Sequence, residues 1–255
     1  MTDPSTPLGL AAARGAVAVA SGWTDTQVSI RLRRGTGGTV RVEGVLCSAP
    51  VWFRWDGSTL WLVGSGASPV GEDHIRVAVD VGPGVTIAMR SVAASVVYAA
   101  RGIGTRWDTD IRVAAGARLD WRPEPVILTA HARHTTTTTV HAQRGAHVVV
   151  DEVVVLGRTG ETTGAFRSTL DVRLDDAPVL LTSVDSAIPG WSGPAGAGGK
   201  DVVASRLHIG DAPACPTGGR RDVAVLEPSD ECRLAVATAT DVADVRRSMD
   251  EVLPG

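Results

Sequence analysis

The stretch VAVDVGPGVTIAM at residues 77–89 sets the fold class, because it places a glycine between two runs of alternating apolar and polar residues. Alternation over about four to eight residues is typical of a half-buried strand, whereas an amphipathic helix repeats roughly every 3.6 residues. Gly84 stands where a tight turn needs a positive φ, which glycine adopts at little cost. The stretch therefore predicts a β-hairpin.

The same unit recurs twice, as IRVAAGARLDW at residues 111–121 and TVHAQRGAHVVV at residues 139–150. Gly116 and Gly145 occupy the turn position in these two copies. Further alternating runs, read as half-buried strands, lie at 28–33, 39–43, 75–81, 170–174 and 223–226. The sequence therefore predicts an all-β, mainly β protein, with packed antiparallel β-sheets built from successive hairpins.

One helical segment is expected, at the C-terminus over residues 240–253. Thr240 is a candidate cap, and acidic residues fill the first turn. Five apolar side chains share one face of this helix: Val242, Val245, Met249, Val252 and Leu253.

Length and composition suit one domain over residues 1–255, with a loosely ordered N-terminus at 1–22 and a flexible Gly/Pro-rich loop at 186–200. The formal net charge of −3 comes without a run of like charges, which argues against nucleic acid and membrane as partners. Three cysteines (Cys47, Cys215 and Cys232) form no C-x-x-C pair, as expected in a reducing compartment. Residues 1–22 do not resemble a signal peptide, so we expect a cytoplasmic protein.

The usual catalytic patterns are missing from the sequence. Residues 198–201, GGKD, resemble the end of a phosphate-binding loop, but an aspartate stands where that loop has its metal-binding hydroxyl. There is no G-x-S-x-G nucleophile elbow, and no cysteine lies in a catalytic signature. We therefore expect a protein that is not an enzyme and holds no permanent cofactor.

A histidine-rich stretch, HARHTTTTTVHAQRGAH at residues 131–147, is the main candidate for metal binding. Its threonine run favours a strand, which separates most of the imidazoles. Only His141 and His147 could face each other, across the expected hairpin turn. Two ligands do not complete a metal site, so the stretch predicts no bound metal and at most a transient nickel contact at this pair.

Two alternatives remain open at this point. One is a small β-sandwich metalloenzyme that uses His141 and His147 with a nearby acid. The other is a β-sandwich ligand-binding module with exposed tryptophans, although the alternate spacing of Trp52, Trp55 and Trp61 is more typical of a core.

The stretch LDWRPEPVIL at residues 119–128 departs from a plain strand. Prolines on both sides of Glu124 cannot donate to a ladder, so the strand must end, bulge or lie at an edge there. The restricted backbone holds Glu124 in a defined direction, close to Trp121.

These residues carry a resemblance to a known family. GARLDWRPEPVIL at residues 116–128 resembles the GA-x-L-E-W-x-P-Q-E stretch of the urease accessory protein UreD (UreH) family. Asp73 lies in a segment that resembles the family's G-G-D turn, and Tyr98 stands where the family has K-V-Y. Residues 151–168 resemble its E-x-x-x-L-G-R-x-x-x-G-E pattern through Gly157, Arg158, Gly160 and Glu161. Pro123 is a departure, because the family has glutamine there.

The resemblance covers roughly residues 28 to 253 and implies a mainly β scaffold without catalysis of its own. It implies a chaperone for urease maturation by nickel incorporation, with nickel as transient cargo. The implied partners are UreF, the GTPase UreG through UreF, and the apo-urease subunits. It also implies structural or interaction roles for Asp73, Tyr98, Trp121, Glu124, Arg158, Gly160 and Glu161.

Overall fold

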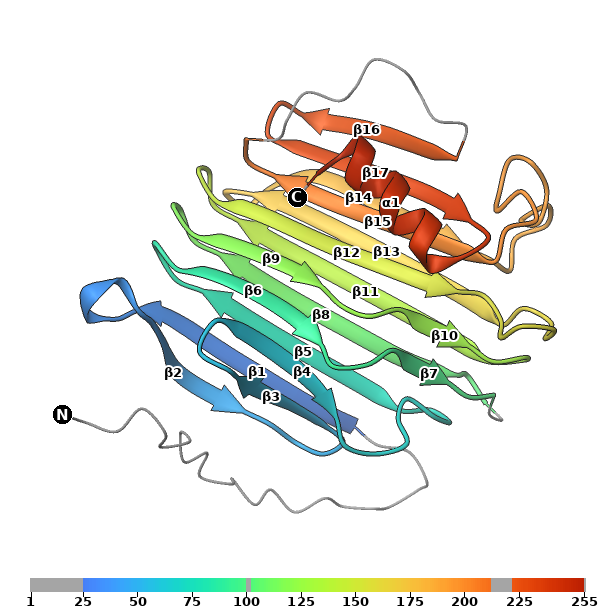
Figure 1. The fold of residues 1–255 in the computed structure, drawn as a ribbon, viewed down its shortest axis with the longest axis horizontal. Helices are drawn as coiled ribbons and strands as arrows, with labels where there is room; N and C mark the ends of the chain where they lie inside the picture. Colours follow the sequence, from blue (N-terminus) through green and yellow to red (C-terminus); the bar gives the residue numbers. More distant parts are fainter. Residues whose placement is uncertain (1–24, 100–101, 212–221, 255) are drawn as a thin grey trace.

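The structure is a computed structural model that describes residues 25–99, 102–211 and 222–254. The expected N-terminal segment 1–22 and Cys215 lie outside these residues. Within them, two β-sheets pack face to face, with one helix on the outside (Figure 1). This confirms the all-β class predicted from the sequence.

Sheet A and sheet B are the names used here for the two layers. Sheet A has seven strands, in the spatial order β14 (Ala177–Asp185), β13 (Ala165–Leu174), β11 (Arg133–Ala142), β8 (Thr105–Val113), β5 (His74–Val81), β1 (Asp25–Arg34) and β2 (Val40–Leu46). Sheet B follows the order β16 (Val223–Ser229), β17 (Cys232–Ala239), β15 (Val202–Ile209), β12 (His147–Val155), β9 (Arg118–Arg122), β6 (Thr86–Ser91), β4 (Thr59–Gly64) and β3 (Val51–Trp55). Beside this path, β10 (Val126–Leu128) pairs with β12 and with β7 (Ser95–Val97). A 3-10 turn, η1 (Thr36–Gly38), joins β1 to β2.

The pairing of the strands corrects the prediction of antiparallel hairpins. In sheet A, β1, β5, β8, β11 and β13 run parallel to one another, and in sheet B so do β4, β6, β9 and β12. The turn at Gly84 carries the chain from β5 in sheet A to β6 in sheet B, and the turns at Gly116 and Gly145 do the same for later strands. The glycine and the alternation were correctly identified, but they specify a tight turn and a buried face rather than the neighbouring strand.

The two ends of the sandwich differ in their connections. At the end that we call the turn end (left in Figure 1), residues 82–85, 114–117 and 143–146 link the sheets. Each turn also hydrogen-bonds to the previous one, because the amide of Ala114 donates to Val81 and that of Gln143 donates to Val113, both at 2.9 Å. The opposite end, called the loop end, holds the longer segments 65–73, 156–164 and 186–201 and the described residues 98–99 and 102–104 between β7 and β8.

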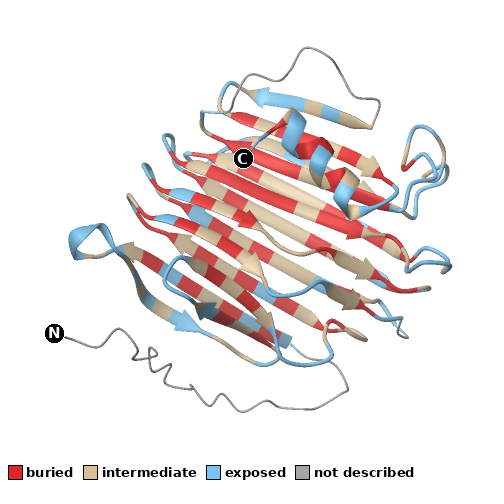
Figure 2. Cartoon of the chain, viewed as in Figure 1, coloured by how far each residue is buried: buried red, intermediate tan, exposed pale blue. Residues whose placement is uncertain are grey.

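The main core lies between the sheets and consists mostly of aliphatic side chains, as the red stretches of Figure 2 indicate. It includes Leu32, Ile111, Leu119 and Trp121, each at most 5% exposed. Because successive side chains of a strand point to opposite faces, alternate residues enter this core and the others face outward. The alternation in the sequence therefore identified the buried face correctly.

The C-terminal helix α1 (Val242–Val252) covers part of the outer face of sheet B. Val245, Met249 and Leu253 are buried against β15 and β17, as predicted. The predicted cap was wrong by one residue, because the side chain of Asp241, and not Thr240, accepts the amide of Asp244 at 2.8 Å. None of the helices in the described ranges is long and apolar enough to cross a membrane.

The loop at 186–200 connects β14 in sheet A to β15 in sheet B. Ala197 is buried, and Trp191 packs against a small apolar cluster that includes Leu128 and Phe166. Its flexibility stays a prediction. Cys47 and Cys232 are both free thiols.

Candidate functional site

The loop end carries candidate side chains from three separate segments. Asp73 begins this group, just before β5, and is only 2% exposed. Its carboxylate accepts the hydroxyl of Ser68 at 2.8 Å and the amide of Val70 at 3.0 Å, while its carbonyl accepts the amide of Arg106 at 2.8 Å. Asp73 therefore closes the turn before β5 and fastens it to β8.

Arg158 and Glu161 form an exposed ion pair in the loop between β12 and β13. The Nε of Arg158 donates to Oε1 of Glu161 at 2.9 Å, and Oε2 of Glu161 accepts the amide of Ala130 at 3.1 Å. Gly160 has a φ of 80°, which allows the tight turn between the two charged residues. The hydrogen bond from Arg158 lowers the pKa of Glu161, so that the carboxylate stays charged.

Tyr98 lies beside this ion pair, directly after β7. Its side chain is 47% exposed, and it is close enough to contribute to raising the pKa of Arg158, although Glu161 has the larger effect. Three further apolar side chains in the loops of this end are exposed, namely Val92, Ile103 and Ile188. The loop end thus combines an exposed apolar surface with a fixed ion pair.

Glu124 lies where the strand is interrupted, between β9 and β10, which confirms the break predicted from the two prolines. Its amide donates to the hydroxyl of Ser91 at 2.7 Å, and its carboxylate accepts Arg246 of α1 at 3.1 Å. Trp121 is buried in the main core. Glu124 therefore connects β6, the interrupted strand and the helix.

A chain of alternating charges runs across the outer face of sheet B from β6 to α1. Asp120 pairs with Arg90 at 3.0 Å and with Arg122 at 2.8 Å, and Arg122 lies 3.8 Å from Asp250 in the helix. Asp250 in turn pairs with Arg206 at 2.7 Å. The charges join three strands and α1 into one network.

Arg206 is the buried member of this network, with only 2% of its surface exposed. It contacts both carboxylate oxygens of Asp151, at 2.7 and 2.8 Å, and the carbonyl of Leu253 at 3.0 Å. Burial by itself would lower the pKa of Arg206, but the hydrogen bonds and the charge of Asp151 outweigh it and raise the pKa. Arg206 could not be singled out from the sequence, because its partner Asp151 lies in a different strand.

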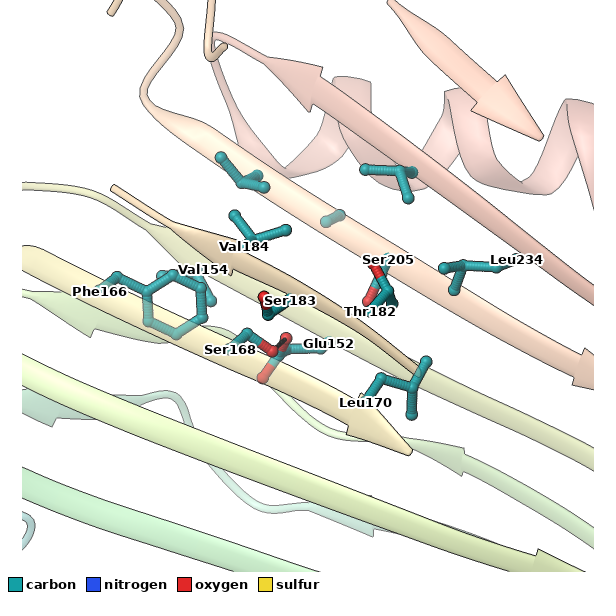
Figure 3. Close-up of a pocket in the computed structure, with 13 residues that line it drawn as sticks. Glu152, Val154, Phe166, Ser168, Leu170, Thr182, Ser183, Val184, Ser205 and Leu234 are labelled. Atoms are coloured by element: carbon teal, nitrogen blue, oxygen red, sulfur yellow. Dashed lines mark hydrogen bonds between the residues drawn. The ribbon is translucent and has the colours of Figure 1, made fainter. Parts of the chain in front are cut away.

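A second group of polar side chains, the interior polar cluster, lies between the sheets and consists of the buried Thr105, His134, Thr136 and Ser168 and the partly buried Glu152. Figure 3 shows Glu152 and Ser168 beside a cavity of about 40 Å³ between the sheets. Glu152 accepts the hydroxyls of Thr136 at 2.6 Å and Ser168 at 2.5 Å. Burial raises the pKa of Glu152, since the charged form loses its hydration.

His134 lies two residues from Thr136 on the same strand and is 3% exposed. Its Nδ1 is 2.7 Å from the hydroxyl of Thr105, its ring stacks on Phe166, and its Nε2 has no hydrogen-bond partner in the described part of the chain. Loss of hydration lowers the pKa of His134 to about 4, so the imidazole is neutral near pH 7.

The sequence is similar throughout to a known family. The family model of the UreD urease accessory protein matches residues 29–252. The chain belongs to the UreD family of urease accessory proteins. UreD of Frankia casuarinae is 32% identical to this chain over 254 aligned residues, which cover 86% of this chain and 78% of the relative. UreD of Streptomyces coelicolor is 31% identical, with coverage of 86% and 91%.

Most of the residues that resemble UreD motifs lie at the loop end. Asp73, Tyr98 and the Arg158–Glu161 pair come from three segments that lie in the connections of that end, whereas Glu124 lies partway along sheet B, in the break between β9 and β10. Arg206, Glu152 and His134 were missed. Glu152 could have been suspected from its place in the apolar strand VVVDEVVV, but the other two lie in ordinary alternating strands.

The arrangement of histidines expected from the sequence is wrong for this UreD chain. His141 alternates with Val140 and Ala142, which enter the core, so it faces outward from sheet A. His147 precedes Val148, also in the core, and faces outward from sheet B. The turn between them crosses the sandwich, so the pair lies on opposite faces and not across a hairpin. Among the described residues, no three His, Cys, Asp or Glu side chains gather in an arrangement that could hold a metal ion.

The three tryptophans of the ligand-binding alternative lie on the β3–β4 pair. Trp55 packs against the main core. The indole N–H groups of Trp52 and Trp61 donate to Ser65 at 2.9 Å and Asp56 at 2.6 Å. These indoles are held by their own neighbours, so they do not favour a ligand platform.

Proposed function

We propose that this chain is a non-enzymatic chaperone for the insertion of nickel into apo-urease. It would act in the cytoplasm, in a complex with UreF and, through UreF, the GTPase UreG. The match of the UreD family model to residues 29–252 carries this proposal, because it spans nearly the whole sandwich and α1. The relatives named above are urease accessory proteins, which supports a role beside the enzyme.

The loop end is the surface we assign to partner proteins. Exposed Val92, Tyr98 and Ile103 would lose contact with water in a complex, which favours association. The Arg158–Glu161 pair would lie at the polar rim of such an interface, where charged residues set orientation.

Nickel would be cargo rather than a resident cofactor of this chain. The interior polar cluster supplies an imidazole nitrogen at His134 and a carboxylate at Glu152, and both are ligand types for divalent nickel. Each group alone would contact the ion only in passing, because among the described residues no three His, Cys, Asp or Glu side chains gather to hold a metal ion. Replacing His134 and Glu152 by glutamine should therefore lower the nickel content of the matured urease.

Co-expression with the urease subunits and the other accessory proteins tests the proposal. Omitting this chain should leave urease inactive and poor in nickel, measured by urea hydrolysis and by metal analysis of the purified enzyme. Fully active, nickel-loaded urease without this chain would contradict the proposed function.

The Glu124→Ala variant tests whether Glu124 organises the chaperone. It should lower either the yield of soluble protein or urease activation, since it removes the link to Arg246 in α1. Unchanged solubility together with unchanged activation would show that Glu124 has no such role.

A further inference from the structure

The two sheets end differently on the side of β14 and β16. β14 is the last strand of sheet A, and its Thr182 and Val184 face a cavity whose opposite wall includes Ser205 of β15 and Leu234 of β17 (Figure 3). In sheet B, β16 follows β17 as one further strand. Figure 1 shows β16 as the outermost strand on this side, and residues of β14 and β16 approach each other there.

The free edge of β14 can accept another strand. β14 pairs with β13 on one side, and no described strand pairs with its other side. The amide of Ser186 donates to Phe166 in β13, so by alternation the amides of Leu181 and Ser183 point away from β13. The sequence APVLLTSVD has no charged side chain before Asp185 to protect this edge, and Leu181 is 74% exposed at its centre.

The inward face of β16 is apolar and uncovered. Ala224 and Leu226 pair with Val236 and Leu234, whose side chains face the space between the sheets. Leu226 is 48% exposed, and Figure 2 shows that most of β16 is exposed. The free backbone of β14 and the exposed apolar face of β16 thus border the same edge of the sandwich, which we call the recess.

We propose that an extended segment of a partner protein adds to the edge of β14 and covers the inward face of β16. Its backbone would pair with Leu181 and Ser183, and every second side chain would be apolar to pack on Leu226. A second copy of this chain is the less suitable occupant, because each copy would bring its own β16 to the edge that the other copy has to cover.

Exposed acidic side chains at the turn end indicate which residues one end of the bound segment should carry. β14 begins and β16 ends at the turn end, beside Asp176 and Asp230. Both aspartates are exposed, and neither forms an ion pair within the described ranges. The neighbouring acids Asp175 and Glu231 are both paired with Arg144. The bound segment should therefore carry basic residues at the end that lies between these two turns.

A synthetic peptide tests the proposal on the full chain. The probe is a fluorescent peptide of alternating valine and threonine with two arginines at one end, and the control peptide carries two glutamates instead. Fluorescence anisotropy should show saturable binding of the arginine peptide, with weaker binding of the glutamate peptide. Asp176→Asn combined with Asp230→Asn should remove this preference.

Two variants locate the binding edge. Ser183→Pro removes an outward amide without breaking the ladder to β13, and Leu226→Glu places a charge in the recess. Each should weaken binding by about tenfold or more, a loss typical of a hot-spot contact. Leu46→Glu, a matched change of an exposed leucine on the edge strand β2, should leave binding unchanged. A circular dichroism melt of each variant confirms that it folds.

Three outcomes would overturn the proposal. The first is no saturable binding of the arginine peptide. The second is equal binding by the Leu226→Glu and Leu46→Glu variants. The third is slow hydrogen exchange at the amides of Leu181 and Ser183 before any peptide is added, which would mean that the edge is already occupied. Protection lost on dilution would then identify a second copy as the occupant, and protection that persists would identify another segment of this chain.

Discussion

The turn end and the loop end connect the same strands in opposite ways. At the turn end, each short turn repeats the hydrogen bonds of the one before, as in Ala114 to Val81 and Gln143 to Val113. At the loop end, each connection differs in length and makes its own contacts, such as Glu161 with Ala130. Regular turns hold the strands in register, which leaves the other end free to carry exposed apolar and charged side chains.

The largest expected effect is a loss of stability on replacing a glycine by alanine, which should be greater at the loop end than at the turn end. Gly104 at the loop end has a φ of 94°, and a Cβ there would lie 2.5 Å from the carbonyl oxygen of Arg133. Gly104→Ala should lower the free energy of unfolding by about 2–5 kcal/mol, from backbone strain and the clash together. Urea denaturation measures it.

Gly116→Ala is the matched change at the turn end. Gly116 also has a positive φ, of 69°, but a Cβ there would meet nothing within 4 Å. Only the backbone strain remains, so the loss should be about 1–2 kcal/mol. If both variants lose the same free energy of unfolding, the close packing of Gly104 against β11 does not contribute to stability.

The next effect is a dependence of stability on pH that both ends should share. His134 near the loop end and His208 near the turn end each have a pKa lowered to about 4, mainly by loss of hydration. The unfolded chain takes up a proton at each histidine below about pH 6.5, whereas the folded chain does not. Stability should therefore be full above about pH 6.5 and fall as the pH drops toward 4.

Urea denaturation across this pH range checks the expectation. Either His134→Gln or His208→Gln should reduce the dependence of the free energy of unfolding on pH by up to about 1.4 kcal/mol per pH unit. The histidine that remains in each variant should still contribute its own share of this dependence. A slope that neither variant changes would show that these imidazoles do not control acid stability.

A smaller effect should appear in urease activation. Glu161→Ala removes the exposed pair with Arg158 at the loop end, and we expect activation to fall by roughly tenfold if partners dock there. Glu231→Ala removes the comparable exposed pair with Arg144 at the turn end. This control should activate urease normally, and an equal fall in both variants would assign no special role to the loop end.

The smallest effect is expected for His141 and His147. Replacing both by glutamine should leave urease activation and nickel content unchanged, because the two side chains face outward from opposite sheets. A clear loss of nickel in the matured urease would restore a role for these histidines.

The sequence was sufficient for the strands but not for their neighbours. Alternation identifies which side chains of β5 or β8 are buried. The alternating pattern is the same whether the next strand pairs in a hairpin or crosses to the other sheet. The pairing of β5 with β8 depends on hydrogen bonds between segments far apart in the chain. Gly84 allows either outcome, because both need a positive φ.

The candidate site was predicted in part for the same reason. Glu124 and the Arg158–Glu161 pair are local features that a short stretch reveals. Arg206 and Glu152 can be recognised only in the folded chain, because their partners come from other elements. Arg206 pairs with Asp151 and Asp250, and Glu152 accepts hydrogen bonds from Thr136 and Ser168.

The order of the strands in sheet A has a consequence for synthesis on the ribosome. From β1 through β5, β8, β11 and β13 to β14, each strand lies beside the one that was made before it. A newly translated strand therefore meets a finished template and does not wait for later residues. The growing protein exposes one advancing edge until β14 ends the series, and α1, translated last, closes over the outer face of sheet B.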